Sequence, residues 1–195
     1  MRRLIAIENV TLDGVMQAPG RPDEDPRGDF PYGGWAAPYM DQVAAEYMGV
    51  GMAAAQPAMV LGRRTYEDFA GYWPHQTDNP YTPVLDAAQK HVASRTLTPA
   101  DLTWQNSTLL AGEAASSVAA LKSSSGPDLT VLGSGNLVRA LLRAGLVDDL
   151  LLSIYPLVLG TGRQLFQAGL PRTGLTLVES VPTTTGVLIA RYRRA

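Results

Sequence analysis

The sequence contains no cysteine among its 195 residues and only two histidines, His75 and His91. The lack of cysteine excludes disulfide bonds, thiol catalysis, iron–sulfur clusters and zinc sites built from thiolates. Two histidines far apart in the sequence, with no thiolate to join them, give poor support for a transition-metal site. We therefore expect this protein to hold no metal.

Charge of either sign is also scarce. Charged residues make up 17 % of the chain, and 16 Lys and Arg against 18 Asp and Glu leave a net charge of −2. Without a basic excess, we expect neither a nucleic-acid partner nor a membrane partner. No apolar run reaches the roughly 18 residues that a membrane span needs, and Glu8 ends the N-terminal run too early for a secretory signal. A cytoplasmic protein is the expectation.

Apolar content is what the chain does have, since hydrophobic residues account for 46 % of it, which is typical of a folded globular protein. The length predicts one domain, 1–195, that can bury a full core without cross-links. Residues 17–34 include four prolines and four glycines, which predicts a long loop. The loop is either a functional lid or a plain surface insertion.

Apolar runs and turn signals predict an alternation of strands and helices. Strands are expected at 3–10, 58–61, 90–93, 103–111, 129–132 and 150–159. Helices are expected at 37–56, 66–72, 114–122 and 136–144, with a proline-rich loop at 74–83. Two alternating segments, 175–181 and 186–192, predict a terminal hairpin. This order predicts an α/β fold with a mostly parallel central sheet and an antiparallel hairpin at its C-terminal end.

The clearest motif is VLGSGNLV at 131–138, between a predicted strand and a predicted helix. Glycines let the backbone approach a phosphate, and the free N–H groups of a helix start attract an anion. The motif is not a full dinucleotide fingerprint, because Val138 occupies the third glycine position. It is either a phosphate-binding nest or a tight turn that binds nothing.

Two other strand ends carry groups suited to phosphate. One is followed by backbone N–H groups, two guanidinium groups and a hydroxyl, in Gly62, Arg63, Arg64 and Thr65. The other ends in Ser94 and Arg95. Arginine binds phosphate through two hydrogen bonds, although an arginine pair can also be simply solvated. Because strand ends of an open α/β sheet lie along one edge, the three segments together match one extended dinucleotide.

No nucleophile motif and no P-loop lysine occur in the sequence. The carboxylates near the expected cleft are Glu8, Asp13, Asp41 and Glu67. Asp13 and Asp41 are the candidates for catalysis. Each has a structural alternative, since Asp13 can cap its own turn and Asp41 can start the next helix.

These elements, in this order and spacing, resemble the dihydrofolate reductase fold. The closest resemblance is to the RibD C-terminal-like family, the reductase domain of the bifunctional riboflavin-biosynthesis enzyme. It spans nearly the whole chain, and PLVLGTGRQLF at 156–166 is its most family-specific motif. The other motifs are TLDG at 11–14, LGRRTYE at 61–67, Ser94-Arg95 and LGSG at 132–135. The resemblance implies a three-layer αβα sandwich that binds NADPH.

The resemblance also implies which positions bind NADPH. Those near its phosphates are Gly62, Arg63, Arg64, Thr65, Ser94, Arg95, Gly133, Ser134, Gly135 and Asn136. Within this set, Ser94 and Arg95 would lie at the adenosine 2′-phosphate and 133–136 would wrap the pyrophosphate. Ile5 and Ala6 would pass near the nicotinamide. Members of the riboflavin type tend to be homodimers, so a homodimer is expected, and the 17–34 loop would be a lid or a dimer element.

The sequence departs from the folate enzymes at the acid that the resemblance would make catalytic. Those enzymes place a buried carboxylate on the first long helix, a few residues after a tryptophan. Here Trp35 is followed by Asp41, one position late. Asp41 either anchors a pterin or delivers a proton, or it points to solvent. The chain also lacks the zinc motifs of the riboflavin enzyme's deaminase domain.

These observations leave three hypotheses. The leading one is an NADPH-dependent reductase of a small nitrogen heterocycle, either a pterin or the pyrimidine 5-amino-6-(5-phosphoribosylamino)uracil. The second is a non-catalytic NADP(H)-binding sensor or assembly protein. The third is a structural dimer whose glycine turns bind nothing. Nucleotide binding separates the third hypothesis from the others, and turnover separates the first two.

Overall fold

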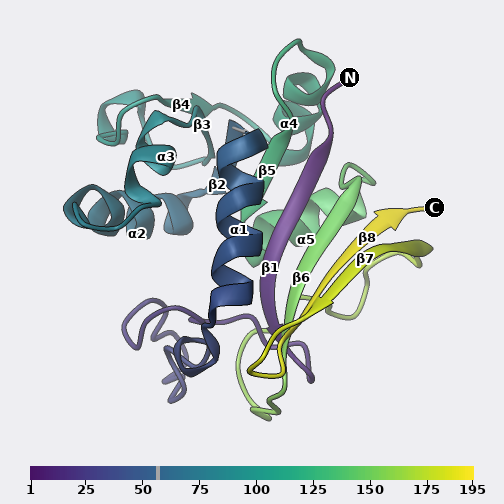
Figure 1. Ribbon diagram of the computed structural model, residues 1–195. Coiled ribbons are helices and arrows are strands. Elements are labelled where there is room, and N and C mark those ends of the chain that lie inside the picture. The colour runs from purple at the N-terminus through teal and green to yellow at the C-terminus, as the bar shows by residue number, and fades with distance from the viewer. Residues whose placement is uncertain (56–57) are drawn as a thin grey trace.

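The computed structural model describes residues 1–55 and 58–195, which build one eight-stranded sheet. Its strands are β1 (Leu4–Thr11), β2 (Ala58–Gly62), β3 (Lys90–Ala93), β4 (Ser107–Leu110), β5 (Leu129–Leu132), β6 (Asp149–Tyr155), β7 (Leu175–Pro182) and β8 (Leu188–Arg194). Their order across the sheet is β4-β3-β2-β5-β1-β6-β8-β7 (Figure 1). Strands β1 to β6 are parallel, and β8 is antiparallel to both β6 and β7.

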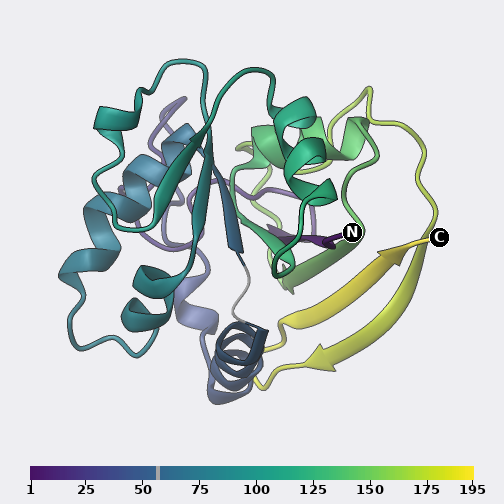
Figure 2. The ribbon, with the colours of Figure 1, turned by 90° about the horizontal axis from the view of Figure 1, so that it is seen from above.

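Helices cover both faces of this sheet. They are α1 (Gln42–Ala55), α2 (Arg63–Tyr72), α3 (Thr82–Ala87), α4 (Ala114–Ser123) and α5 (Gly135–Arg143), with short 3-10 turns at Ala37–Tyr39, Trp73–His75 and Pro99–Asp101. Val60 of β2 packs with Val118 of α4 and Leu141 of α5. Its neighbour Leu61 faces the other way and packs with Tyr66 of α2. Figure 2 shows α1 on the opposite side of the sheet from α4 and α5. The predicted αβα layering and fold class are thus confirmed.

Most predicted elements are present, and two strands, at 90–93 and 129–132, have the predicted bounds. The helix predicted at 66–72 begins earlier, at Arg63, so the two arginines lie in its first turn. The strand predicted at 150–159 ends at Tyr155, because Pro156 has no N–H for the sheet.

Other predicted bounds were wrong. The strand predicted at 103–111 is confined to β4. The helix predicted over 37–56 is a 3-10 turn followed by α1, and residue 56 lies outside the described residues. The proline-rich segment 74–83 was predicted as a loop, yet α3 begins within it at Thr82, where Pro83 occupies the first turn.

Strand β1 loses one of its two neighbours part-way along its length. It pairs with β5 from Leu4 to Ile7, but with β6 from Ile5 to Thr11. Beyond Ile7, the edge of β1 that faced β5 meets the turn after β5, where the N–H of Gly133 donates to the Ile7 carbonyl at 3.3 Å. The two strands therefore separate at their carboxyl ends.

The long 17–34 loop is held by contacts within itself and with α2. The buried Gln17 side chain donates to the carbonyls of Asp25 (2.9 Å) and Arg27 (2.8 Å). The Arg21 guanidinium forms an ion pair with Asp68 of α2 and lies 4.2 Å from the ring centroid of Tyr72. The loop thus rests on the helix that begins with Arg63 and Arg64, and its role as a lid stays a prediction.

Candidate functional site

The three strand-end segments predicted to bind a dinucleotide lie at one edge of the sheet. Strands β3, β2, β5 and β1 are successive neighbours and run parallel, so their carboxyl ends point the same way. Segment 94–95 follows β3, segment 62–65 follows β2 and segment 133–136 follows β5. The structure brings these segments together, and their binding role stays a prediction.

Ser134 joins two of these segments directly. Its Oγ accepts a hydrogen bond from the Gly62 N–H (2.9 Å) and donates one to the Thr65 Oγ1 (2.6 Å). Ser134 has a positive φ of 65°, as Gly133 does at 58°, so the turn is left-handed at both positions. A Cβ on Gly62 would lie 3.2 Å from the Ser134 Oγ, a tight contact that Ser134 would have to relieve by shifting. The starts of α2 and α5 are thereby fixed side by side.

Both helix starts can accept an anion. Neither α2 nor α5 has a side-chain hydrogen bond at its N-cap or an acidic residue in its first turn. Their free N–H groups and helix dipoles favour negative charge. Arg63 and Arg64 are exposed in the first turn of α2, and Arg63 forms only a loose ion pair with Glu67, at 3.5 Å. The arrangement offers two sets of N–H donors and two guanidinium groups to a diphosphate.

The third segment forms a compact turn after β3. The Ser94 Oγ accepts hydrogen bonds from the N–H groups of Thr96 (3.1 Å) and Leu97 (3.0 Å). Arg95 is exposed beside it. The hydroxyl of Ser94 therefore shapes the turn, and the guanidinium of Arg95 is the part that a ligand phosphate can reach.

The two predicted nicotinamide neighbours on β1 face opposite sides of the sheet. Ala6 is fully buried in the core that includes Leu137 and Leu141 of α5. Ile5 and Ile7 point to the α1 side and are only half-buried. A ligand on the α1 side can therefore touch Ile5, while Ala6 can offer only its backbone.

A polar pair that the sequence analysis missed lies farther along β1. The Tyr155 hydroxyl donates to the Asn9 Oδ1 at 3.2 Å, and burial raises the pKa of Tyr155. The Tyr155 ring meets Trp35 and Tyr39 edge to face, with centroid distances of 5.0 and 5.8 Å. This group combines aromatic surfaces with hydrogen-bonding atoms, as recognition of a planar heterocycle requires.

Asp41 has structural hydrogen bonds on both oxygens. Its Oδ1 accepts from the Ala44 N–H (2.8 Å) at the start of α1. Its Oδ2 accepts from the N–H (2.7 Å) and the hydroxyl (2.6 Å) of Thr184, in the turn between β7 and β8. The hydrogen bond from the Thr184 hydroxyl contributes most to lowering the pKa of Asp41. Asp41 thus caps α1 and ties it to the hairpin, and its catalytic role stays a prediction.

Asp13 is engaged in a similar way. It accepts from the Thr11 hydroxyl (2.5 Å) and from the N–H groups of Leu159 (3.3 Å) and Gly160 (2.8 Å). The Thr11 hydrogen bond contributes most to lowering the pKa of Asp13, and the backbone donors add to it. The ionised carboxylate joins its own turn to the loop after β6. Its catalytic role also stays a prediction.

Glu8 is the one carboxyl near the site that is deeply buried, with 3 % of its surface exposed. Its Oε1 has no hydrogen-bond partner among the described residues. Burial raises the pKa of Glu8 to about 8, although the nearby charge of Arg139 partly opposes the effect. In the sequence, the one signal for Glu8 is an acid inside an apolar strand, and no role is predicted from it.

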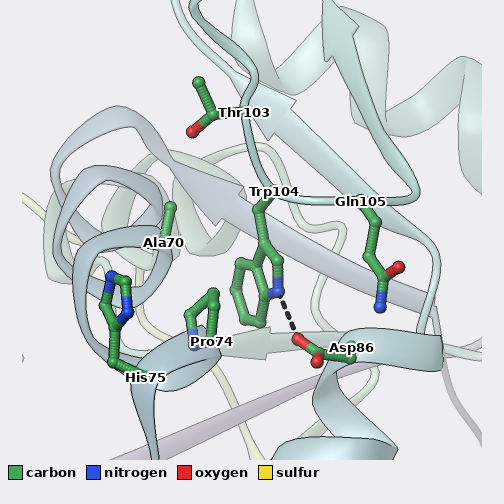
Figure 3. A pocket seen from close by; sticks show the side chains of 7 residues that line it. All are labelled: Ala70, Pro74, His75, Asp86, Thr103, Trp104 and Gln105. Atoms are coloured by element: carbon green, nitrogen blue, oxygen red, sulfur yellow. Dashed lines mark hydrogen bonds between the residues drawn. The ribbon is translucent and has the colours of Figure 1, made fainter.

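A pocket of about 420 Å³ lies away from the edge where the parallel strands have their carboxyl ends (Figure 3). It is lined by Ala70, Pro74, His75, Asp86, Thr103, Trp104 and Gln105. Asp86 and Gln105 precede β3 and β4, so the pocket sits at the amino ends of those strands. The Trp104 indole N–H donates to Asp86 at 2.6 Å, which occupies the donor that a ligand would use. The pocket is separate from the candidate site.

Within the residues that the structure describes, no group of three metal-ligating side chains lies together. In the same part of the chain, no helix combines the length and the apolar character needed to cross a membrane.

The family model for the RibD C-terminal domain matches residues 2–189. The chain belongs to the RibD C-terminal domain family. It is 28 % identical over 138 residues to an uncharacterised protein, YyaP, of Bacillus subtilis. The matched region covers 69 % of this chain and 72 % of YyaP. This relative carries no stated activity.

Solved structures with the same fold include proteins named for a function. A putative riboflavin biosynthesis protein from Shewanella sp. PV-4 matches with a TM-score of 0.69 and 19 % identity, over 99 % of both chains. A pyrimidine reductase-like protein from Corynebacterium diphtheriae matches with a TM-score of 0.61 and 17 % identity, over 100 % of this chain and 92 % of that one. Dihydrofolate reductase from Enterococcus faecalis, complexed with NADP(H) and RAB-propyl, matches with a TM-score of 0.61 and 15 % identity, over 98 % of this chain and 96 % of that one. This RibD C-terminal domain therefore shares its fold with proteins that are named as reductases.

Proposed function

We propose that this RibD C-terminal domain is an NADPH-dependent reductase of a small nitrogen heterocycle, either a pterin or a ribosylaminopyrimidine. The observation that carries the proposal is the bridge from Gly62 through Ser134 to Thr65. It holds two uncapped helix starts side by side at the carboxyl edge of the sheet. Paired helix starts of this kind bind a diphosphate, the group that links the two halves of NADPH.

The residues around the bridge fit the remaining charges of NADPH. Arg63 and Arg64 supply guanidinium groups next to the diphosphate. Arg95, which follows the neighbouring strand, is the group for the adenosine 2′-phosphate, and it favours NADPH over NADH. The bound cofactor would supply the hydride, so this chain's own residues bind it, orient it and exclude water.

The substrate would bind on the α1 side of β1. Ile5 and Ile7 offer a half-buried apolar surface there, and Asn9 with Tyr155 offers hydrogen-bonding atoms at its far end. A planar heterocycle in this position would lie next to the point where β1 and β5 separate. The product proton would come from a held water or from a carboxyl. Both oxygens of Asp41 already accept hydrogen bonds within the protein.

One observation favours the second candidate function, a non-catalytic NADP(H)-binding protein. Both carboxylates that the sequence nominated for catalysis, Asp13 and Asp41, use their oxygens in hydrogen bonds between structural elements. A chain of this kind would bind the cofactor and report its redox state without turnover.

We also propose a cytoplasmic homodimer, with the 17–34 loop as a lid over the cofactor.

Turnover separates the two functions. The purified protein is mixed with NADPH and, in turn, with dihydrofolate, a ribosylaminopyrimidine and a flavin-type acceptor, while the absorbance of the reduced nicotinamide is followed. The reductase predicts loss of absorbance with a heterocyclic acceptor and none without it. NADPH binding with no loss in any mixture would favour the non-catalytic protein.

A further inference from the structure

Glu8 occupies the position on β1 where the strand loses its neighbour. The last residue of β1 in register with β5 is Ile7, opposite Leu132, so Glu8 is level with the turn that begins at Gly133. Glu8 alternates with Ile7 and shares its face with Ala6 and Val10, which pack against α5. The carboxyl therefore lies beside the first turn of α5, at the inner end of the opening between β1 and β5.

Among the described residues, the surroundings of Glu8 give its Oε1 no hydrogen-bond partner. On β6, the residue in register with it is Leu152, which is apolar. From α5, the one charged side chain facing it is Arg139, itself 5 % exposed. The Arg139 guanidinium donates instead to the Gln164 carbonyl (2.8 Å) and to the Asn136 side chain. Glu8 thus keeps a buried Oε1 with no hydrogen bond among the described residues.

An unpaired polar atom in a buried position is destabilising, and native proteins rarely keep one without a use. Replacing Glu8 with an apolar residue would remove that cost, so stability does not explain the acid. A ligand group that reaches the carboxyl does explain it. Such a group would enter where the pairing of β1 and β5 ends, beside the turn at Gly133 that is proposed to bind phosphate.

The state of the carboxyl indicates which ligand group suits it. Burial raises the pKa of Glu8 to about 8, so the carboxyl is largely neutral at pH 7. A neutral carboxyl has one hydrogen-bond donor and one acceptor side by side. A primary carboxamide has the same two groups in the complementary order, and the nicotinamide ring of NADPH carries one.

We propose that Glu8 recognises the carboxamide of the nicotinamide ring through one donated and one accepted hydrogen bond. The inference rests on the proposed function, because it takes NADPH as the ligand. Met16 covers the entrance, since its thioether lies against Gly135 where a Cβ would collide with it. Its unbranched side chain can move aside for the ring. Glu8 would then orient the ring for hydride transfer toward the α1 side.

Two variants and two ligands test this recognition. Glu8→Met removes both hydrogen bonds at similar size, and Glu8→Gln keeps one donor and one acceptor without titrating. The ligands are NADPH and 2′-phospho-ADP-ribose, which has the same phosphates but no nicotinamide. We expect Glu8→Met to weaken NADPH binding about tenfold or more and to leave 2′-phospho-ADP-ribose within about twofold. Glu8→Gln should bind NADPH within about threefold of the wild type.

The pH dependence supplies a second readout that a purely structural role would not produce. In the wild type, NADPH affinity should fall as the pH rises through about 8, because the ionised carboxylate loses its donor. The Arg139 guanidinium stays charged over this range. In Glu8→Gln the same pH interval should show no such fall, and 2′-phospho-ADP-ribose should show none in either protein.

Three results would overturn the proposal: equal weakening of both ligands by Glu8→Met, unchanged NADPH affinity in that variant, or a pH dependence that persists in Glu8→Gln. A wild-type protein that binds neither ligand would instead contradict the proposed function. The thermal stability of Glu8→Met should equal or exceed that of the wild type, which checks that the variant is folded.

Discussion

Ser134 shows how one hydroxyl can organise a site made of distant segments. It accepts from the Gly62 N–H and donates to Thr65, residues that lie about seventy positions earlier in the chain. A Cβ at position 62 would crowd the Ser134 hydroxyl, and the left-handed backbone at position 133 favours glycine. The site therefore depends on backbone geometry as much as on charge.

The arginine pair at the start of α2 should contribute to NADPH binding. Replacing Arg63 and Arg64 together with alanine should weaken NADPH binding by about 2–4 kcal/mol, because charge-assisted hydrogen bonds to phosphate are lost. Calorimetric titration measures the change. Arg172→Ala, at an exposed loop position, is the matched control and should bind as the wild type does. Equal affinities in all three proteins would remove the arginines from the site.

At the residue scale, the sequence predicted the groups that strand ends bring together and missed those that meet only through distant contacts. Gly62, Ser94 and Ser134 could be grouped, because parallel strands place their carboxyl ends at one edge. The hydrogen bond between Asn9 and Tyr155 joins residues 146 positions apart, and no local pattern indicates it. The structural hydrogen bonds of Asp41 depend likewise on a turn near the C-terminus.

At the scale of elements, one buried carboxylate adds to the backbone pairing that joins β8 to β6 and so to the parallel part of the sheet. Asp149 at the start of β6 has no exposed side-chain surface, and it pairs with Arg3 (2.5 Å), Arg191 (2.6 Å) and Arg193 (3.1 Å). Burial alone would raise the pKa of Asp149. The hydrogen bonds from Arg193 and Arg191, with the charges of Arg191 and Arg3, outweigh it and lower the pKa.

Asp149→Asn should reduce the free energy of unfolding by about 2–3 kcal/mol at pH 7, a value below that of a fully buried pair because the arginines are partly exposed. A lowered pKa in the folded state gives stability that is present above the ordinary pKa and is lost as the pH falls through the lowered one. The difference in free energy of unfolding between Asp149→Asn and the wild type should therefore shrink below about pH 4. Urea unfolding at pH 7 and pH 3 measures it.

The exposed Asp78→Asn is the control for this series and should change stability by less than about 0.5 kcal/mol. A destabilisation of Asp149→Asn that is equal at both pH values would show that packing, not the ionised carboxylate, holds β8.

The elements themselves were predictable where one local rule decides them. The strands at 90–93 and 129–132 are short apolar runs between turn signals, and their bounds were confirmed. The prolines of 74–83 favour a loop and so hide α3 in the sequence, whereas Pro83 in the first turn favours a helix start. The end of β6 was placed too late because the apolar run continues past Pro156, which cannot donate to the sheet.

At the scale of the whole molecule, the C-terminal hairpin leaves an apolar surface uncovered. Leu175, Leu177, Val178 and Leu188 are between 38 % and 53 % exposed, and β7 forms one of the two edges of the sheet (Figure 2). In the register of β7 and β8, Leu177 pairs with Tyr192, so they share one face. An exposed apolar edge strand of this kind invites pairing or aggregation unless a partner covers it.

The proposed homodimer would cover this edge. Light scattering after size exclusion should then give twice the chain mass of 20.8 kDa. Leu177→Asp should yield the mass of one chain, because it would place a charge in the interface. Val158→Asp, at a 69 % exposed position in the loop after β6, is the control and should remain dimeric. A wild-type protein with the mass of one chain would contradict the dimer.

Binding of NADPH at the carboxyl edge of the sheet underlies every function proposed for this chain. The most direct measurement is a thermal-shift titration of the wild-type protein with NADPH and NADH side by side. At a concentration one hundred times its Kd, a bound ligand adds about 2.7 kcal/mol to the free energy of unfolding. We expect a clear shift with NADPH and a smaller one with NADH, which lacks the 2′-phosphate. No shift with either nucleotide would reduce the glycine turns to structural features, and equal shifts with both would contradict the 2′-phosphate site at Arg95.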